Sequence, residues 1–248
     1  MRIAIVTDIH EDIISLQLAF RKIEKLGIDK TVCLGDISGF GVPYYQHYDT
    51  RSAHECLKLI RENCDTIILG NHDLNATNRI PEISPEFEYP NNWFDLDYFE
   101  KKEISEGRVW LYEENEMHHK YSKNDIAFLS EKKEIEIFET DGLRILFSHF
   151  VYPNITGSEQ EFCFDPIDFE AHFDFMLEGK CTIGIIGHSH PIGLLYYTRE
   201  NISKSDFGKQ KLPDEPVCII APSITKGGFK NGFLIFDTEN LEVEAVSI

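Results

Sequence analysis

Five short polar clusters in the sequence contain the residue types that bind divalent metal ions. Each cluster follows a short apolar run and supplies aspartate, asparagine or histidine side chains. A single DxH or HxH triplet is weak evidence, because short motifs often match by chance. Five clusters in the same position relative to an apolar run together predict one shared metal site. They are Asp8-Ile9-His10, Gly35-Asp36, Gly70-Asn71-His72-Asp73, Ser148-His149 and Gly187-His188-Ser189-His190.

The side chains predicted as ligands carry a charge that suits two metal ions and a phosphate ester. Two carboxylates, one neutral amide and four neutral imidazoles give −2, and two divalent ions bring +4, which leaves −2 + 4 = +2. Mixed nitrogen and oxygen ligands without thiolate favour Mn, Fe, Zn, Co or Ni over Ca and Mg, with Mn as the favoured ion. Two neighbouring ions need a bridging carboxylate, for which Asp36 is the candidate. The seven predicted ligands are Asp8, His10, Asp36, Asn71, His149, His188 and His190.

Alternating strands and helices would bring these clusters together. Runs rich in β-branched residues at 3–6, 31–34, 66–69, 143–147 and 182–186 predict buried strands. Apolar spacing predicts helices at 13–26 and around 53–60. In such a βαβ arrangement the loops after the strands meet at one edge, where ligands bind. Within each DxH and HxH triplet, extended backbone would point the two ligands to the same side.

A segment from about residue 75 to 139 interrupts this alternation. It contains Pro81, Pro85 and Pro90 with many acidic and aromatic residues, which predicts an inserted helical cap, either a lid or an interface. Apolar runs at 194–198, 217–221, 233–237 and 241–246 predict a second, antiparallel sheet. The predicted fold class is therefore α/β, a two-sheet β-sandwich flanked by helices with an inserted cap, in a single domain over residues 1–248.

Composition limits the partners of this chain. The 248 residues carry 24 Lys and Arg against 43 Asp and Glu, a formal net charge of −19. Such a surface repels duplex nucleic acid and anionic membranes, whereas two bound dications would still attract a small phosphorylated substrate. Met1 precedes a strand-like run rather than a cationic leader, so we expect a cytoplasmic protein, monomeric or homo-oligomeric. The six cysteines lack metal-site spacing and are expected to be small buried side chains.

Two further groups of polar residues are expected to be structural. The histidines at 47, 54, 118, 119 and 172 lie outside the five clusters, although His118 and His119 could reach a bound phosphate. The acidic runs at 113–116 and 131–136 are expected to form solvated faces rather than extra metal sites.

The order DxH, GD, GNHD, H, GHxH resembles the calcineurin-like metallophosphoesterase family over residues 1–74 and 143–193. The resemblance implies a four-layer α/β/β/α fold, with Asp8, His10, Asp36 and His190 on one ion and Asp36, Asn71, His149 and His188 on the other. It also implies that His72 protonates the departing alkoxide while Asp73 orients its imidazole. The reaction expected is attack on phosphorus by a metal-bridging hydroxide.

The stretch from Gly35 to Pro43 also resembles the GDxxGYGP segment of a small prokaryotic subgroup with a helical cap. The sequence departs from that subgroup at Glu11, which adds a carboxylate, at Asp12, which can cap the next helix, and at Phe150, which adds bulk. A small phosphodiester or a nucleotide is the preferred substrate, because a cap would narrow the cleft. The alternatives are a protein phosphatase, a dinucleoside polyphosphate hydrolase, or a non-catalytic scaffold similar to the retromer subunit.

Overall fold

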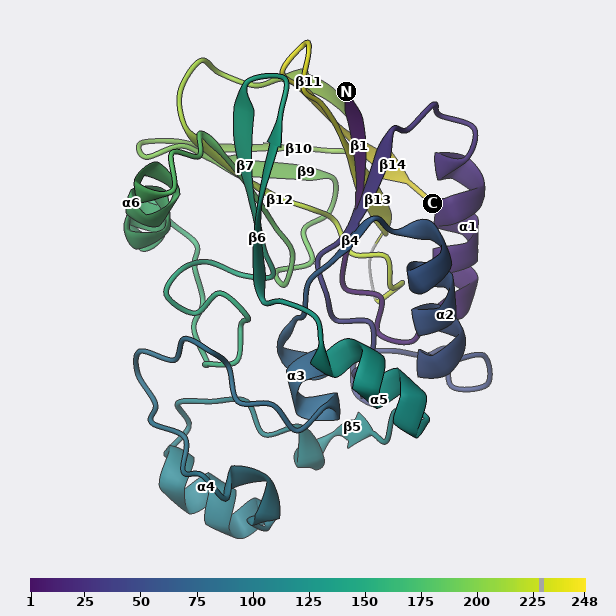
Figure 1. Ribbon diagram of the computed structural model, residues 1–248, viewed down its shortest axis with the longest axis vertical. Coiled ribbons are helices and arrows are strands. Elements are labelled where there is room, and N and C mark those ends of the chain that lie inside the picture. The colour runs from purple at the N-terminus through teal and green to yellow at the C-terminus, as the bar shows by residue number, and fades with distance from the viewer. Residues whose placement is uncertain (228–229) are drawn as a thin grey trace.

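Two mixed sheets form the centre of the molecule. The computed structural model describes residues 1–227 and 230–248, and within them it contains two six-stranded sheets and a two-stranded one (Figure 1). The first sheet consists of β1 (Arg2–Val6), β2 (Lys30–Cys33), β4 (Thr66–Ile67), β11 (Gly208–Lys211), β13 (Gly232–Asp237) and β14 (Glu242–Ser247), in the order β11-β14-β13-β1-β2-β4. The second consists of β6 (Ile135–Thr140), β7 (Leu143–Ser148), β8 (Ile183–Ile186), β9 (Leu194–Tyr197), β10 (Ile202–Ser205) and β12 (Val217–Ile220), in the order β10-β9-β12-β8-β7-β6.

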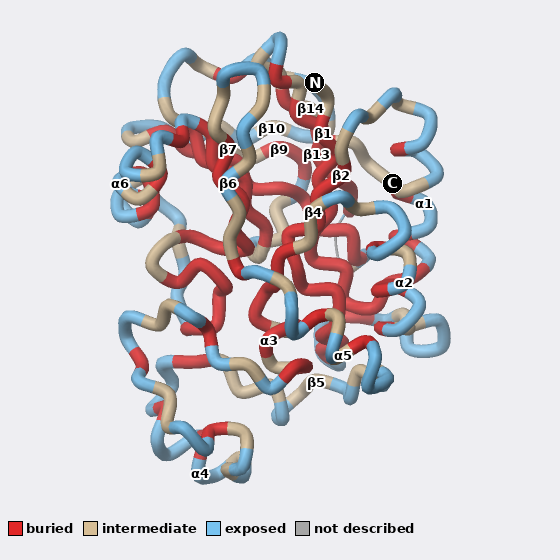
Figure 2. The backbone as a smooth tube through the Cα atoms, in the orientation of Figure 1, coloured by how far each residue is buried: buried red, intermediate tan, exposed pale blue. Residues whose placement is uncertain are grey.

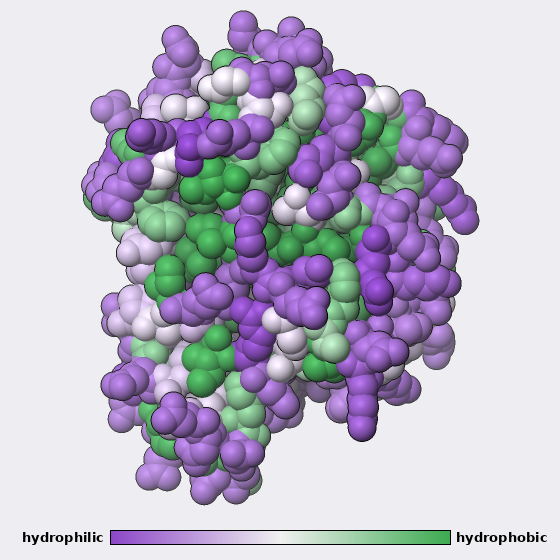
Figure 3. Space-filling view, viewed as in Figure 1, coloured by the Kyte–Doolittle hydropathy of each residue, from purple (hydrophilic) through white to green (hydrophobic). Residues whose placement is uncertain are grey.

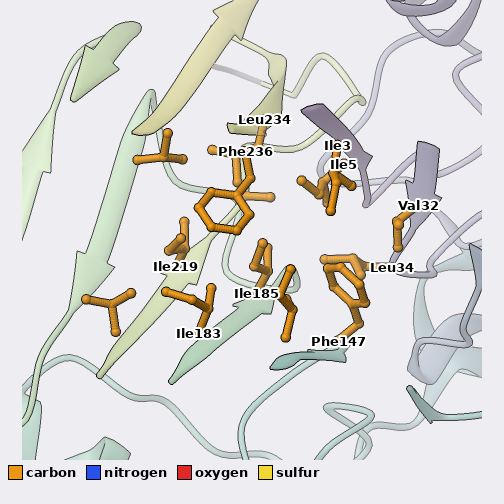
Figure 4. Close-up of a cluster of buried hydrophobic side chains, with 14 of the residues drawn as sticks. Ile3, Ile5, Val32, Leu34, Phe147, Ile183, Ile185, Ile219, Leu234 and Phe236 are labelled. Carbon is orange, nitrogen blue, oxygen red and sulfur yellow. The ribbon is translucent and has the colours of Figure 1, made fainter. Parts of the chain in front are cut away.

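The facing sides of the two sheets form the main apolar core. Because side chains alternate along a strand, Ile3 and Ile5 of β1 point into this core. There they meet Phe147 of β7 and Ile185 of β8, as Figure 4 shows. Burial of these side chains, each worth about 1.5–3 kcal/mol, holds the two sheets together at a fixed distance.

Helices cover the outer face of each sheet. Ala4 of β1 points away from the sandwich and belongs to a second core with α1 (Ile13–Ile23) and α2 (Ala53–Asn63). On the other side, α6 (Glu170–Glu178) packs Phe173 and Met176 onto the second sheet, after the short helix η3 (Pro166–Phe169). The result is four layers, α/β/β/α, with α1 and α2 on one side of Figure 1 and α6 on the other. The predicted fold class is confirmed.

The predicted helices and strands are present in the structure, but some of their ends and some strand pairings differ from the prediction. Asp12 caps α1 by accepting from the amide of Ser15, as expected, and the helix ends at Ile23 rather than at Leu26. The expectation that the C-terminal strands form the second sheet is wrong in part. β13 pairs antiparallel with β1, so β13 and β14 extend the first sheet, and β7, β8 and β12 of the second sheet run parallel.

Most of the segment at 75–139 lies below the sandwich in Figure 1, whereas its last residues, 135–139, belong to β6 of the second sheet. It contains η1 (Trp93–Asp95), α4 (Tyr98–Ser105), η2 (Tyr112–Glu114), β5 (Glu116–Met117) and α5 (Lys123–Ser130). Phe87, Trp93 and Val109 form a small separate core in it, so some of its aromatic residues are structural. Figure 2 shows that the part around α4 is largely exposed. We call residues 75–134, which precede β6, the cap segment.

The cap segment contacts the rest of the chain at a few defined places. β5 pairs antiparallel with β3 (Phe40–Gly41), which follows Asp36 closely in sequence. The short helix α3 (Asn71–Ala76) begins at the predicted ligand Asn71 and leads into the cap segment. Most of the face in Figure 3 is hydrophilic, as the charge predicts, while hydrophobic residues show across its middle. Among the residues described, no helix is long and apolar enough to cross a membrane.

Candidate metal centre

The five polar clusters meet at one end of the sandwich. The loops after β1, β2 and β4 come from the first sheet, and those after β7 and β8 come from the second. His149 Nε2 lies 3.1 Å from Asp36 Oδ2, and His190 Nε2 lies 3.2 Å from Asp8 Oδ1. The sequence predicts that the ligands lie at the edge of one sheet. In the structure, loops from both sheets contribute ligands at the same end of the sandwich.

The candidate ligand atoms form overlapping groups. Asp8, His10 and His190 place one ligand atom each within 4.8 Å of one another, and so do Asp36, His149 and His188. These two groups belong to the two ions that the family resemblance implies. Nitrogen and carboxylate oxygen donors at this spacing suit a transition metal ion. A third group joins His10 and Asp36 to His72.

Hydrogen bonds orient two of the histidine rings. His10 Nδ1 is 2.8 Å from the carbonyl oxygen of Gly39, and His149 Nδ1 is 2.7 Å from that of Leu34. A carbonyl oxygen only accepts, so each Nδ1 carries a hydrogen, and Nε2 is the nitrogen that can bind a metal ion when the ring is neutral. Metal-binding histidines are commonly held in this way.

Among the described residues, three buried polar atoms in the centre find no hydrogen-bond partner at a suitable angle, although His149 Nε2 and Asp8 Oδ1 lie close to Asp36 and His190. The three atoms are Asp8 Oδ1, Asn71 Oδ1 and His149 Nε2. Leaving such an atom unpaired costs about 1–3 kcal/mol, and each of the three belongs to a predicted ligand. Burial alone would raise the pKa of Asp8 and Asp36, but neighbouring histidines outweigh it and keep both values low, so both carboxyl groups are ionised. These residues fit a pair of divalent ions.

The backbone at the centre is strained. A positive φ in a non-glycine residue costs on the order of 1–3 kcal/mol and is typical of functional sites. The expectation of extended backbone within the DxH and HxH triplets is wrong, because tight left-handed turns turn the side chains inward instead. Five of the predicted ligands have this conformation: Asp8 (52°), His10 (44°), Asp36 (53°), His188 (66°) and His190 (46°).

Gly70 lets the backbone approach two of the candidate ligands closely. A Cβ atom at this position would lie 2.2 Å from Asp36 Oδ1 and 2.8 Å from His149 Cε1. Real atoms do not come that close, so any larger residue would push the candidate bridging carboxylate away. Close approach of the backbone to Asp36 therefore requires a glycine before Asn71.

His72 lies beside the candidate ligands and contacts the cap segment. Its Nε2 is 4.0 Å from Asp36 Oδ2, and its Nδ1 is 2.5 Å from Glu116 Oε2 in β5. The Glu116 side chain is only 8% exposed. Burial lowers the pKa of His72, but Asp36 and Glu116 outweigh it and raise that pKa to about 9. The ring is therefore protonated at neutral pH, as a general acid requires.

The structure corrects the expectation for Asp73. Its carboxylate accepts hydrogen bonds from the backbone amides of Ile37 (3.0 Å), Ser38 (3.3 Å) and Gly70 (3.3 Å). It thus holds the loops after β2 and β4 together, while Glu116 occupies the place beside the His72 ring. Glu116 was expected on a solvated face, because the acidic run around it has no pattern that points to His72. Glu134, in the second acidic run, is also buried, and it pairs with Arg79 at 3.0 Å.

The remaining predicted features take structural positions. Glu11 pairs with Arg51 at 2.7 Å, so its extra carboxylate is neutralised. The rings of His118 and His119 stack on each other, with centroids 4.6 Å apart. Neither residue lines the cavity that lies beside the candidate ligands. Phe150 packs against His188, with ring centroids 4.5 Å apart. His172 is fully buried, and its Nδ1 accepts from the amide of Tyr152.

Comparisons with known proteins agree with this geometry. The calcineurin-like phosphoesterase family model matches residues 1–191. An uncharacterized protein of Methanocaldococcus jannaschii, MJ0912, is 27% identical over 99% of this chain and 86% of its own length. The structure of a metallophosphoesterase from Sphaerobacter thermophilus aligns with a TM-score of 0.67 at 17% identity, over 100% of this chain and 88% of the other.

A hypothetical protein of Pyrococcus horikoshii, PH1004, has a similar fold as well. It aligns with a TM-score of 0.59 at 15% identity, over 100% of this chain and 87% of the other. At 17% and 15% identity, these two similarities show a shared fold and do not show a shared function. The family model, in contrast, spans more than half of the sequence and includes all seven predicted ligands. The chain belongs to the calcineurin-like phosphoesterase family.

Proposed function

We propose that this chain is a binuclear metal-dependent phosphoesterase that hydrolyses a small phosphodiester or a nucleotide in the cytoplasm, with Mn as the favoured ion. The observation that supports this most directly is the set of unpartnered buried atoms, Asp8 Oδ1, Asn71 Oδ1 and His149 Nε2. They lie among the seven predicted ligands, whose types suit transition metal ions. Bound divalent ions would attract the phosphoryl oxygens and lower the pKa of water.

The residues of the chain would bind the ions, donate a proton to the leaving group and hold the loops of the site in position. Asp8, His10, Asp36 and His190 would hold one ion, and Asp36, Asn71, His149 and His188 the other. His72 donates its Nε2 proton to the oxygen of the leaving alcohol, while the carboxylate of Glu116 holds the opposite side of the ring. Asp73 keeps the loops after β2 and β4 in place through backbone hydrogen bonds.

Two alternatives within enzymes use the same residues. A protein phosphatase needs an open surface for a folded substrate, whereas a dinucleoside polyphosphate hydrolase needs cationic side chains for several phosphates. The cap segment beside the centre favours a small substrate over a protein. A non-catalytic scaffold is the alternative of another class, and the retention of every predicted ligand together with His72 speaks against it.

The test combines elemental analysis with a substrate panel. Purified protein is assayed for bound metal and then, with added Mn, for hydrolysis of a phosphodiester, a phosphomonoester, a dinucleoside tetraphosphate and a phosphopeptide. We expect two divalent ions per chain and the highest kcat/KM on the phosphodiester or a nucleotide. Bound metal without hydrolysis of any ester would support the scaffold instead.

A further inference from the structure

A large cavity opens beside the candidate metal centre. Its volume is about 1040 Å³, and His10, Asn71 and His190 line it together with many side chains from the cap segment and the second sheet. A single phosphoryl group fills only a small part of such a space. The rest of the cavity is therefore available to the group that the phosphorus carries.

Three aromatic residues form one wall of this cavity, which we call the aromatic wall: Trp110, Phe162 and Phe164. The rings of Trp110 and Phe162 meet edge to face, with centroids 6.0 Å apart, and those of Phe162 and Phe164 are parallel within 7° at 6.2 Å. Phe162 is 65% exposed and Phe164 is 70% exposed. The folded chain leaves the apolar surface of these rings in contact with water. A ligand that covers the rings would bury this surface and gain binding free energy from it.

The charges in the cavity do not suit a chain of phosphates. Apart from histidines, the basic residues among its described lining are Lys102 and Lys204. Lys102 already pairs with Glu114 at 3.2 Å. Glu161 adds a carboxyl group to the same lining. Additional phosphates placed there would meet carboxylates and, among the described lining residues, one lysine outside any ion pair, so they would be bound weakly.

We propose that the aromatic wall binds a planar aromatic group of the substrate, so that the site selects esters with one phosphorus and an aromatic substituent over polyphosphates. This inference rests on the proposed function, because the metal centre must hold the phosphoryl group. The aromatic group stacks on the exposed faces of Phe162 and Phe164 while the phosphoryl group lies at the predicted ligands. A nucleobase or a phenyl ring meets this requirement.

The test uses two phosphonates that cannot be hydrolysed. Benzylphosphonate and methylphosphonate share the same anionic group and differ by a phenyl ring. Their binding to the Mn-loaded protein is measured by calorimetry, which needs no turnover. We expect benzylphosphonate to bind about tenfold more tightly, the scale of one favourable aromatic contact.

Variants then assign this advantage to the aromatic wall. Phe162→Ala combined with Phe164→Ala should remove the advantage of benzylphosphonate while methylphosphonate binding and metal content stay unchanged. Both rings are exposed, so the fold should tolerate their loss. Phe99→Ala is the matched control, because Phe99 is 76% exposed on α4 and does not line the cavity. In wild-type protein, kcat/KM should be lower for a dinucleoside tetraphosphate than for an aryl phosphodiester.

The outcomes separate the inference from the proposed function. An advantage that survives in the double variant, or a loss that is equal for both phosphonates, would overturn the inference and leave the proposed function in place. If metal-loaded wild-type protein bound neither phosphonate and hydrolysed no ester, both would fall together.

Discussion

At the scale of the residue, the predicted ligands and the predicted acid should respond differently to substitution. Asp36→Asn should weaken binding of both ions, because Asp36 is the predicted bridge. His72→Ala should leave metal content nearly unchanged and lower kcat by roughly 10²- to 10⁴-fold, the usual scale of general acid catalysis. Elemental analysis and steady-state kinetics of each variant check this. His54→Ala, which changes a half-exposed side chain, is the control. Loss of metal from His72→Ala would show that His72 is a ligand instead.

Glu116 is the residue that the sequence did not indicate. Its carboxylate raises the pKa of His72, so Glu116→Gln should lower that pKa. Because catalysis needs protonated His72, the fall in rate on the alkaline side should move to lower pH. We expect the drop in kcat to be largest near pH 9, where the wild-type ring is still partly protonated, and smaller at neutral pH, with metal content unchanged.

A pH–rate profile measures the Glu116 effect directly. The matched control is Glu113→Gln, since Glu113 belongs to the same acidic run but pairs with Lys101. A profile with the same pH dependence in Glu116→Gln and wild type would contradict a positioning role for this carboxylate.

At the scale of the element, a buried carboxylate attaches the cap segment to the rest of the chain. Oε1 of Glu159 accepts from Ser84 Oγ (2.5 Å) and from the amides of Glu86 (3.0 Å) and Phe87 (3.1 Å). In Glu159→Ala these donors lose their partner, at about 1–3 kcal/mol each where they stay buried. We expect faster hydrogen exchange at residues 86 and 87 and a lower Tm.

Two further variants test the specificity of this attachment. Glu159→Gln keeps an oxygen at the same place and should lose less stability than Glu159→Ala. Glu88→Ala removes an exposed neighbour and should change little. Equal losses in the alanine and glutamine variants would indicate that charge, rather than hydrogen bonding, holds the cap segment.

At the scale of the whole molecule, one buried histidine makes stability depend on pH. Burial lowers the pKa of His172 from its usual 6.5 to about 4 in the folded state. Between these values the unfolded chain binds a proton that the folded chain does not. The contribution of neutral His172 to the free energy of unfolding is therefore fully present above pH 6.5. It is lost as the pH falls towards 4, and the free energy of unfolding decreases by roughly 3 kcal/mol in all.

Thermal unfolding of His172→Gln as a function of pH measures this effect. Gln keeps a hydrogen-bonding group near the amide of Tyr152 but does not titrate, so the Tm of the variant should fall less than that of wild type between pH 7 and 4.5. Parallel curves for wild type and His172→Gln would exclude His172 as the source.

The sequence by itself determined most of the strands, the first helices and the seven candidate ligands, because these depend on local patterns, whereas β3, β5, β10 and β11 were not predicted. β1 and α1 follow from apolar spacing, and the polar clusters follow directly after their strands. Tertiary structure alone decided that two sheets share the site, since strand pairing joins β1 to the distant β13. It also placed Glu116, rather than Asp73, on the ring of His72. That contact depends on how the cap segment packs, because His72 and Glu116 are 44 positions apart in the sequence, and no local pattern predicts which residues so far apart will meet.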